Sequence, residues 1–206
     1  TGFTTDYWYS NDLANPDRTV GGINYYGGEG YYGVGSDAHD FHSNFWGWDH
    51  TVNDGNAPNN FLIVNGVGNT LRVWEETVAV TTNTNYYFSA WAINLNADGS
   101  NDTYWPKLKF FINDIDPDIN FAAQLGPGVT GNYPNGVPKN QWKDRFYGVW
   151  NSGSNTTAKI TIRQLNTEAG GNDFGIDDIS FGILDPAPAT VSPTSSNDVC
   201  FGETIN

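Results

Sequence analysis

Short stretches in which apolar and polar residues alternate, separated by turn-forming clusters, run through most of this chain. Residues 158–163 (Ala-Lys-Ile-Thr-Ile-Arg) show the pattern most clearly, because every second side chain is apolar. A period of two residues is typical of a β-strand with one buried face and one solvated face. We find no stretch of ten or more residues with the 3.6-residue period of an α-helix, so the sequence favours an all-β fold.

Similar short β patterns, including one continuous apolar run at residues 61–66, predict six further strands, most of them closed by clusters of Asn, Gly, Ser or Thr. These strands cover residues 61–66, 71–80, 86–94, 108–113, 146–150 and 174–181. Two other segments, residues 11–60 and 113–141, are rich in Gly, Asn and Pro and are predicted to be long loops with short strands or a hairpin. Long loops on a compact domain often carry function.

Charge and composition exclude several classes of protein. The chain has 9 Lys and Arg against 23 Asp and Glu, a net charge of −14, and nucleic-acid binding needs the opposite sign. No run of about 18 apolar residues is present, so we predict no membrane insertion. A single cysteine excludes a disulfide scaffold, and 8 Trp, 11 Tyr and 12 Phe are too many for a disordered chain.

The composition changes near the C-terminal end. Residues 185–197 (DPAPATVSPTSSN) contain three of the ten prolines and several Ser and Thr, which is typical of a stiff, exposed linker. Residues 198–206 (DVCFGETIN), with Cys200, look like the opening strand of a following immunoglobulin-like domain, or else a short tail. We therefore predict one β domain over residues 1–184 in a multidomain protein.

Two motifs carry a resemblance to a known group. Residues 174–181 read Phe-Gly-Ile-Asp-Asp-Ile-Ser-Phe and residues 49–51 read Asp-His-Thr, with Tyr-Tyr-Phe-Ser-Ala-Trp at 86–91 between them. With these motifs, residues 2–184 resemble secreted bacterial jelly-roll modules related to carbohydrate-binding modules with the galactose-binding-like fold. The resemblance implies an antiparallel β-sandwich (jelly roll) that is secreted or displayed at the cell surface.

The resemblance also implies a function. Such a module would bind a polysaccharide without catalysis and hold an attached enzyme near its glycan, with calcium stabilising the fold. An adhesion or structural repeat of a cell-surface protein is the alternative, and a fragment of a polysaccharide lyase or hydrolase is a third, weaker hypothesis. Five of the nine basic residues fall within residues 107–145, so an anionic glycan is disfavoured by the net charge but stays open.

Three aspartates are the predicted calcium ligands. Asp177 and Asp178 are adjacent, so on a regular strand their side chains point to opposite faces and one carboxylate must face inward. A buried carboxylate is costly unless it is paired or bound to a metal, and Ca²⁺ prefers oxygen ligands. By the resemblance, Asp178 and Asp49 are the main candidates and Asp177 is a weaker one; an exposed acid pair that accepts backbone hydrogen bonds is the alternative.

Aromatic rings outside the predicted strands are the candidates for sugar binding, because flat rings match the C–H faces of sugars. Trp74, Trp91 and Trp150 lie in strand patterns and are predicted to pack in the core. The predicted ligand-binding residues are Trp46, Trp48, Tyr104, Trp105 and Trp142, with Lys107 and Arg145 as hydrogen-bond donors.

No catalytic pattern stands out, and we predict that the chain is not an enzyme. The only adjacent glutamates, Glu75 and Glu76, point to opposite faces of one strand, whereas glycoside hydrolysis needs two facing carboxyl groups. No Gly-x-Ser-x-Gly motif is present. His39 and His42 have the spacing of a metal site but lie in a predicted loop without a helix to align them.

Overall fold

The computed structural model describes residues 2–14, 29–51, 59–96, 102–115, 122–126, 142, 144–168 and 170–184. The predicted linker and following domain lie outside the described residues. These residues contain ten strands: β1 (Trp8–Tyr9), β2 (Tyr31–Gly35), β3 (Phe61–Asn65), β4 (Arg72–Ala79), β5 (Asn85–Asn94), β6 (Lys107–Ile112), β7 (Ala122–Gln124), β8 (Asp144–Asn151), β9 (Thr157–Gln164) and β10 (Phe174–Ile183). The same residues include two short 3₁₀ helices, η2 (Ala38–Asp40) and η3 (Asp102–Tyr104).

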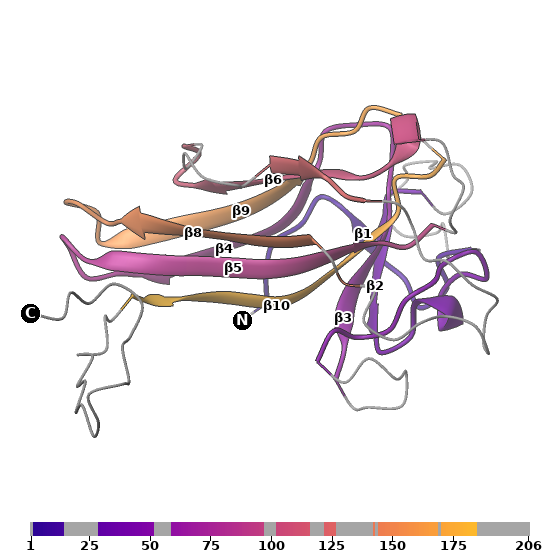
Figure 1. Cartoon of the computed structure of the whole chain (residues 1–206), viewed down its shortest axis with the longest axis horizontal. Helices are drawn as coiled ribbons and strands as arrows, with labels where there is room; N and C mark the ends of the chain where they lie inside the picture. The colour runs from indigo at the N-terminus through magenta and orange to yellow at the C-terminus, as the bar shows by residue number, and fades with distance from the viewer. Residues whose placement is uncertain are drawn as a thin grey trace, which may run out of the picture.

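The strands form two sheets that pack as a β-sandwich, which confirms the predicted fold class. One sheet has six strands in the order β1-β2-β3-β10-β5-β8, and the other has four in the order β4-β9-β6-β7. All pairs are antiparallel except β1 with β2. The long strands run together along the molecule, and β1, β2 and β3 lie toward the end where many connecting segments gather (Figure 1).

The main core fills the space between the two sheets. Strands of the large sheet contribute Phe88, Phe146 and Phe174, and the small sheet contributes Phe110 and Ile162, all at most 2% exposed. The ring of Phe110 lies 5.0 Å from that of Phe88 and 4.5 Å from that of Phe146, so it joins the sheets. Burial of these alternate positions is the physical basis of the two-residue period in the sequence.

A second core lies on the outer face of the large sheet. Phe61, Ile63 and Ile93 point away from the first core and pack with Phe45 and Trp142, which come from outside the strands. Segment 36–51, which carries Phe45, therefore covers part of this outer face. A face that would otherwise be solvated is buried there, over β2, β3 and part of β5.

Because Gly175 has no side chain, Phe61 and Ile93 of the second core pack directly against the backbone of β10. A Cβ atom at this position would lie 2.7 Å from Cε2 of Phe61 and 2.9 Å from Cγ2 of Ile93. We expect Gly175→Ala to lower the free energy of unfolding by about 1–3 kcal/mol, because the added methyl group would collide with Phe61 and Ile93. Urea denaturation measures this change. Gly182→Ala on the same strand is the matched control, because a Cβ there meets nothing within 4 Å. Equal losses in both variants would contradict this packing.

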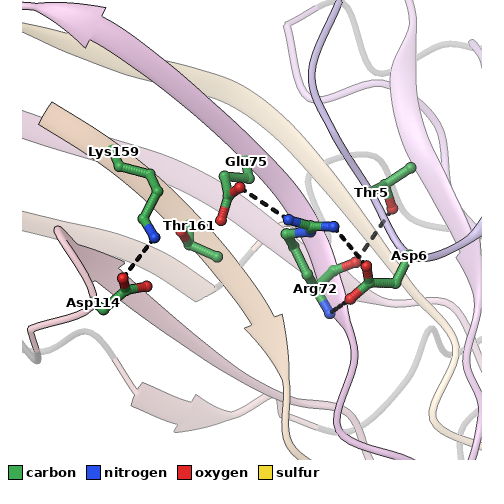
Figure 2. A network of polar contacts seen from close by, with 7 residues as sticks. All are labelled: Thr5, Asp6, Arg72, Glu75, Asp114, Lys159 and Thr161. Atoms are coloured by element: carbon green, nitrogen blue, oxygen red, sulfur yellow. Dashed lines mark hydrogen bonds and ion pairs between the residues drawn. The ribbon is translucent and has the colours of Figure 1, made fainter.

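Polar side chains of the small sheet and of the N-terminal segment form a network of hydrogen bonds and ion pairs (Figure 2). Arg72 at the start of β4 pairs with Asp6 at 2.7 Å and with Glu75 at 2.9 Å, and Glu75 also accepts a hydrogen bond from Thr161 at 3.0 Å. Because Asp6 also accepts from the backbone N–H of Arg72, the network fastens the N-terminal segment to β4. Most hydrogen-bonding groups of these side chains therefore bind other groups of the protein.

Candidate functional site

The half of the outer face of the large sheet that the second core leaves uncovered is the candidate site. Phe88, Ala90 and Ala92 on β5 point into the main core, so Tyr87, Ser89 and Trp91 point to the outer face. Directly paired residues of antiparallel strands lie on the same face. Trp91 is therefore flanked by Arg145 and Asp177, Ser89 by Tyr147 and Ser180, and Tyr87 by Val149 and Gly182.

We call the aromatic, aliphatic and basic side chains of this face the platform: Tyr87, Trp91, Arg145, Tyr147 and Val149. Tyr147 is 44% exposed and Val149 is 40% exposed. On the β10 side the face is lined by Ser180, with a small side chain, and by Gly182, with none, so little side-chain volume stands beside the rings. The exposed ring of Tyr147, the half-buried rings of Tyr87 and Trp91 and the guanidinium of Arg145 lie next to small residues and form a surface that can receive a flat ligand.

Arg145 contacts the three aromatic side chains of the platform. Its Nη2 donates a hydrogen bond to the hydroxyl of Tyr87 at 3.0 Å. The guanidinium carbon lies 5.6 Å from the ring centroid of Trp91 and 5.8 Å from that of Tyr147, within the range of cation–π attraction. The side chain is nevertheless exposed, so the guanidinium is held in place while donors remain for a ligand.

His50 forms one end of the platform. Its ring stacks on Trp91, with centroids 4.2 Å apart and planes 23° from parallel, and meets the edge of Trp142 at 5.7 Å. The backbone N–H of His50 donates to Asp177 at 2.8 Å, and its Nδ1 lies 2.6 Å from Oδ2 of Asp178. The sequence motif Asp-His-Thr thus lies against the last strand, beside the platform.

The structure brings the three predicted calcium ligands into one region, but not in the expected way. The register of β10 shifts between Asp177 and Ser180, and Asp178 has a φ of 49°. Because of this bulge, both carboxylates contact residues 50–51, whereas the regular alternation predicted opposite faces. Burial raises the pKa of Asp177, and the charges of Asp178 and of fully buried Asp49 add to the rise.

Protein donors already bind the oxygens of the acid pair. Both oxygens of Asp177 accept backbone N–H groups, from His50 and from Asp178. The two oxygens of Asp178 face His50 Nδ1 and the hydroxyl of Thr51, the latter at 3.1 Å. The described parts of the chain contain no group of three His, Cys, Asp or Glu side chains placed to hold a metal ion. Calcium at these three aspartates stays a prediction.

Three of the predicted sugar-binding rings lie in or against the second core. Trp142 is only 6% exposed, donates its indole N–H to the carbonyl of Trp48 at 2.8 Å and meets Phe61 edge-on at 5.4 Å. Trp46 and Trp48 are half-buried against the same cluster, and Trp48 donates to Asp37 at 3.0 Å. Trp142 is therefore a core residue, because residues 36–51 and the sheet enclose it, and its ring faces are not open to a sugar.

The remaining predicted residues divide between two places. Tyr104 (37% exposed) belongs to η3, Trp105 follows it, and exposed Lys107 begins β6 in the small sheet. Arg145 lies on β8 in the large sheet and belongs to the platform. The structure thus does not assemble the seven predicted ligand-binding residues into one site.

The platform also includes residues whose sequence pattern does not indicate a binding role. Trp91 was predicted to be a core residue, yet it lies on the outer face at the margin of the second core. Tyr87, Tyr147 and Val149 were not among the candidates. The available signal was the alternation in β5 and β8, but the sequence does not show that one half of the outer face stays uncovered.

Comparisons with known proteins give loose structural likenesses. No protein-family model and no curated protein matches the chain. Among solved structures, the sugar-binding EclA C-terminal domain aligns at 14% identity and a TM-score of 0.40, over 54% of this chain and 66% of that domain. The CBM22-1 xylan-binding domain of Paenibacillus barcinonensis Xyn10C aligns at 15% identity and a TM-score of 0.38, over 66% of this chain and 80% of that one.

An enzyme domain is among these likenesses too. The enzymatically active domain of tailspike protein 4 of bacteriophage CBA120 aligns at 12% identity and a TM-score of 0.40, over 74% of this chain but only 18% of the tailspike domain. Among the described residues, no helix is long and apolar enough to cross a membrane.

Proposed function

We propose that this chain is a polysaccharide-binding module and that the platform is its binding surface. The observation that carries the proposal is the placement of Arg145 among Tyr87, Trp91 and Tyr147 on an exposed sheet face. Sugar rings present C–H faces that pack on aromatic rings, and their hydroxyls accept hydrogen bonds from planar donors such as guanidinium. A flat, exposed sheet face can accommodate several consecutive sugar units of a polysaccharide.

We propose that the glycan is neutral or weakly charged. Arg145 is the basic residue of the platform, whereas Lys107 and Lys109 lie on β6 of the other sheet. Asp177 and Asp178 lie at the His50 end of the same face, and the chain carries a net charge of −14. A densely anionic polymer would meet little positive charge in this arrangement and considerable repulsion.

In this proposal the module binds without catalysis. The acids nearest the platform are neighbours in the chain, and their oxygens accept hydrogen bonds from residues 50, 51 and 178. Two facing carboxyl groups on either side of a scissile bond would be needed for glycoside hydrolysis. The module would act in a secreted or cell-surface protein and hold an attached enzyme near its glycan; an adhesion repeat is the alternative.

A glycan panel tests the proposal. We expect native affinity electrophoresis to show retardation of the chain in at least one neutral polysaccharide, with little retardation in sulfated or uronic polymers. Incubation of the same polysaccharides with the protein should release no reducing ends. Mobility unchanged in every gel would remove the binding function and favour an adhesion role, and released oligosaccharides would show that the chain is an enzyme.

A further inference from the structure

A polar pocket separate from the platform lies beside the second core. It has a volume of about 230 Å³, and its polar lining comes from Glu29, His42, Asn44, Asn65, Asn96 and Asp173. These residues come from five segments that are distant in the sequence. Two carboxylates and three carboxamides around one cavity are an unusual concentration of oxygen acceptors beside a hydrophobic core.

Asp173, immediately before β10, is the most buried acid of this pocket. It is 8% exposed, and one carboxylate oxygen accepts the backbone N–H of Gly66 at 3.0 Å. No other hydrogen bond or ion pair to this carboxylate comes from the described residues. Burial raises the pKa of Asp173 to about 7, and the nearby Glu29 carboxylate adds to the rise. Burial also raises the pKa of Glu29.

Asn65 gives an independent indication that the pocket receives a ligand. It is the last residue of β3, is 5% exposed and lines the pocket. Its Nδ2 donates to the carbonyl of Leu13 at 3.1 Å, and its oxygen has no hydrogen-bond donor within the described ranges. Asn96 likewise commits its Nδ2, to Asn94 at 2.9 Å and to the carbonyl of Gly171 at 2.6 Å.

Among the described residues that line the pocket, no Lys or Arg supplies a compensating positive charge. His42 is the only basic side chain in the described lining, and burial lowers its pKa, which disfavours its positively charged form. Its Nδ1 accepts the backbone N–H of Asn44 at 3.1 Å. Two partly or fully buried carboxylates without a cation are costly, whereas a bound ion would remove that cost.

We propose that this pocket binds a divalent, oxygen-preferring cation such as Ca²⁺, through the carboxylates of Glu29 and Asp173 and the carboxamide oxygens of Asn65 and Asn96. Ca²⁺ takes six to eight oxygen ligands from carboxylates, amides, carbonyls and water, and it tolerates irregular geometry. Neutral oxygens complete the site, so it needs no third acid. This site is distinct from the predicted site at Asp49, Asp177 and Asp178.

Thermal melting at pH 8 tests the site. The protein is first freed of metal with chelator and checked by elemental analysis, then melted with CaCl₂ or with NaCl at matched ionic strength. At a Ca²⁺ concentration about 100 times Kd, we expect the wild-type Tm to rise on the order of 5–10 °C. Asp173→Asn should abolish most of that rise. In chelator the same variant should melt above wild type, because it removes a buried uncompensated charge while its amide oxygen can still accept from Gly66.

Asp178→Asn is the matched control, because it changes one acid to its amide at the other predicted site. If the pocket holds the ion, this variant keeps the full calcium response. The proposal is overturned if wild type shows no calcium response, if Asp173→Asn keeps it, or if Asp178→Asn alone loses it. Melting requires no glycan, so these outcomes are independent of whether the platform binds a polysaccharide.

Discussion

Replacement of Arg145 by alanine is expected to weaken glycan binding by about 10- to 100-fold, measured by isothermal titration with a polysaccharide retained in the panel. A factor of ten corresponds to about 1.4 kcal/mol, the size of one hydrogen bond to a charged group. The variant loses the donors that face a ligand and also the contacts that hold Tyr87 and Tyr147 around the guanidinium. The loss should therefore appear in affinity while the number of binding sites is unchanged.

Two further variants give this prediction its controls. Arg163→Ala removes the same residue type from β9 in the other sheet and should change the affinity by less than twofold. Arg145→Lys keeps the charge but not the planar fork of donors, so we expect it to resemble alanine more than wild type. Unchanged affinity in Arg145→Ala would show that the glycan is bound elsewhere.

Replacement of Phe110 by alanine is expected to lower the free energy of unfolding by about 3–5 kcal/mol, measured by urea denaturation. Phe110 is 1% exposed and contacts Phe88 and Phe146 across the sandwich. Truncation would leave a cavity between two sheets that cannot easily move together. The decrease in the free energy of unfolding should therefore lie near the upper end of the range for substitutions of core residues.

The neighbouring Phe111 supplies the control on the same strand. It is only half-buried and points to the opposite face, with the ammonium of Lys109 5.5 Å from its ring. We expect Phe111→Ala to lower the free energy of unfolding clearly less than Phe110→Ala does, because the substitution removes less buried apolar surface. Comparable losses would mean that the space between the sheets is not the principal core.

Seven strands could be predicted from the sequence because each shows either an alternation of apolar and polar residues or, in β3, a short apolar run closed by Asn-Gly. Strands β3, β4, β5, β6, β8, β9 and β10 all lie within or over the predicted ranges. Strands β1, β2 and β7 have two, five and three residues, and β2 contains two glycines. Strands as short as β1 and β7, or as rich in glycine as β2, exist through pairing with distant partners, so local pattern does not show them.

The site was harder to predict because burial of the outer face depends on tertiary structure. Aromatic residues outside the strands were expected to be exposed and aromatic residues in strands to be buried. Two tryptophans depart from these expectations: the second core encloses Trp142, and Trp91 lies half-buried at its margin, on the outer face of the sheet. The two faces of β5 look alike in sequence, and the path of residues 36–51, together with the placement of Leu13 and Trp142, decides which half is covered.

The acidic residues illustrate the same limit. Adjacent Asp177 and Asp178 were assigned to opposite faces, but a β-bulge at that point turns both toward residues 50–51. Asp173 was not a candidate at all, since nothing in the sequence places it in a pocket with Glu29, 144 residues earlier. Bulges and long-range pockets depend on the packed structure and leave little local signal.

The most direct test of the proposed function compares two tyrosines by calorimetry against the same neutral polysaccharide. Tyr147 is 44% exposed on the platform, and Tyr9 is 56% exposed at the far edge of the same sheet. We predict that Tyr147→Ala weakens binding by about tenfold, as expected for loss of one stacking ring, and that Tyr9→Ala binds like wild type. Equal affinities for both variants and wild type would contradict the assignment of the platform as the glycan-binding surface.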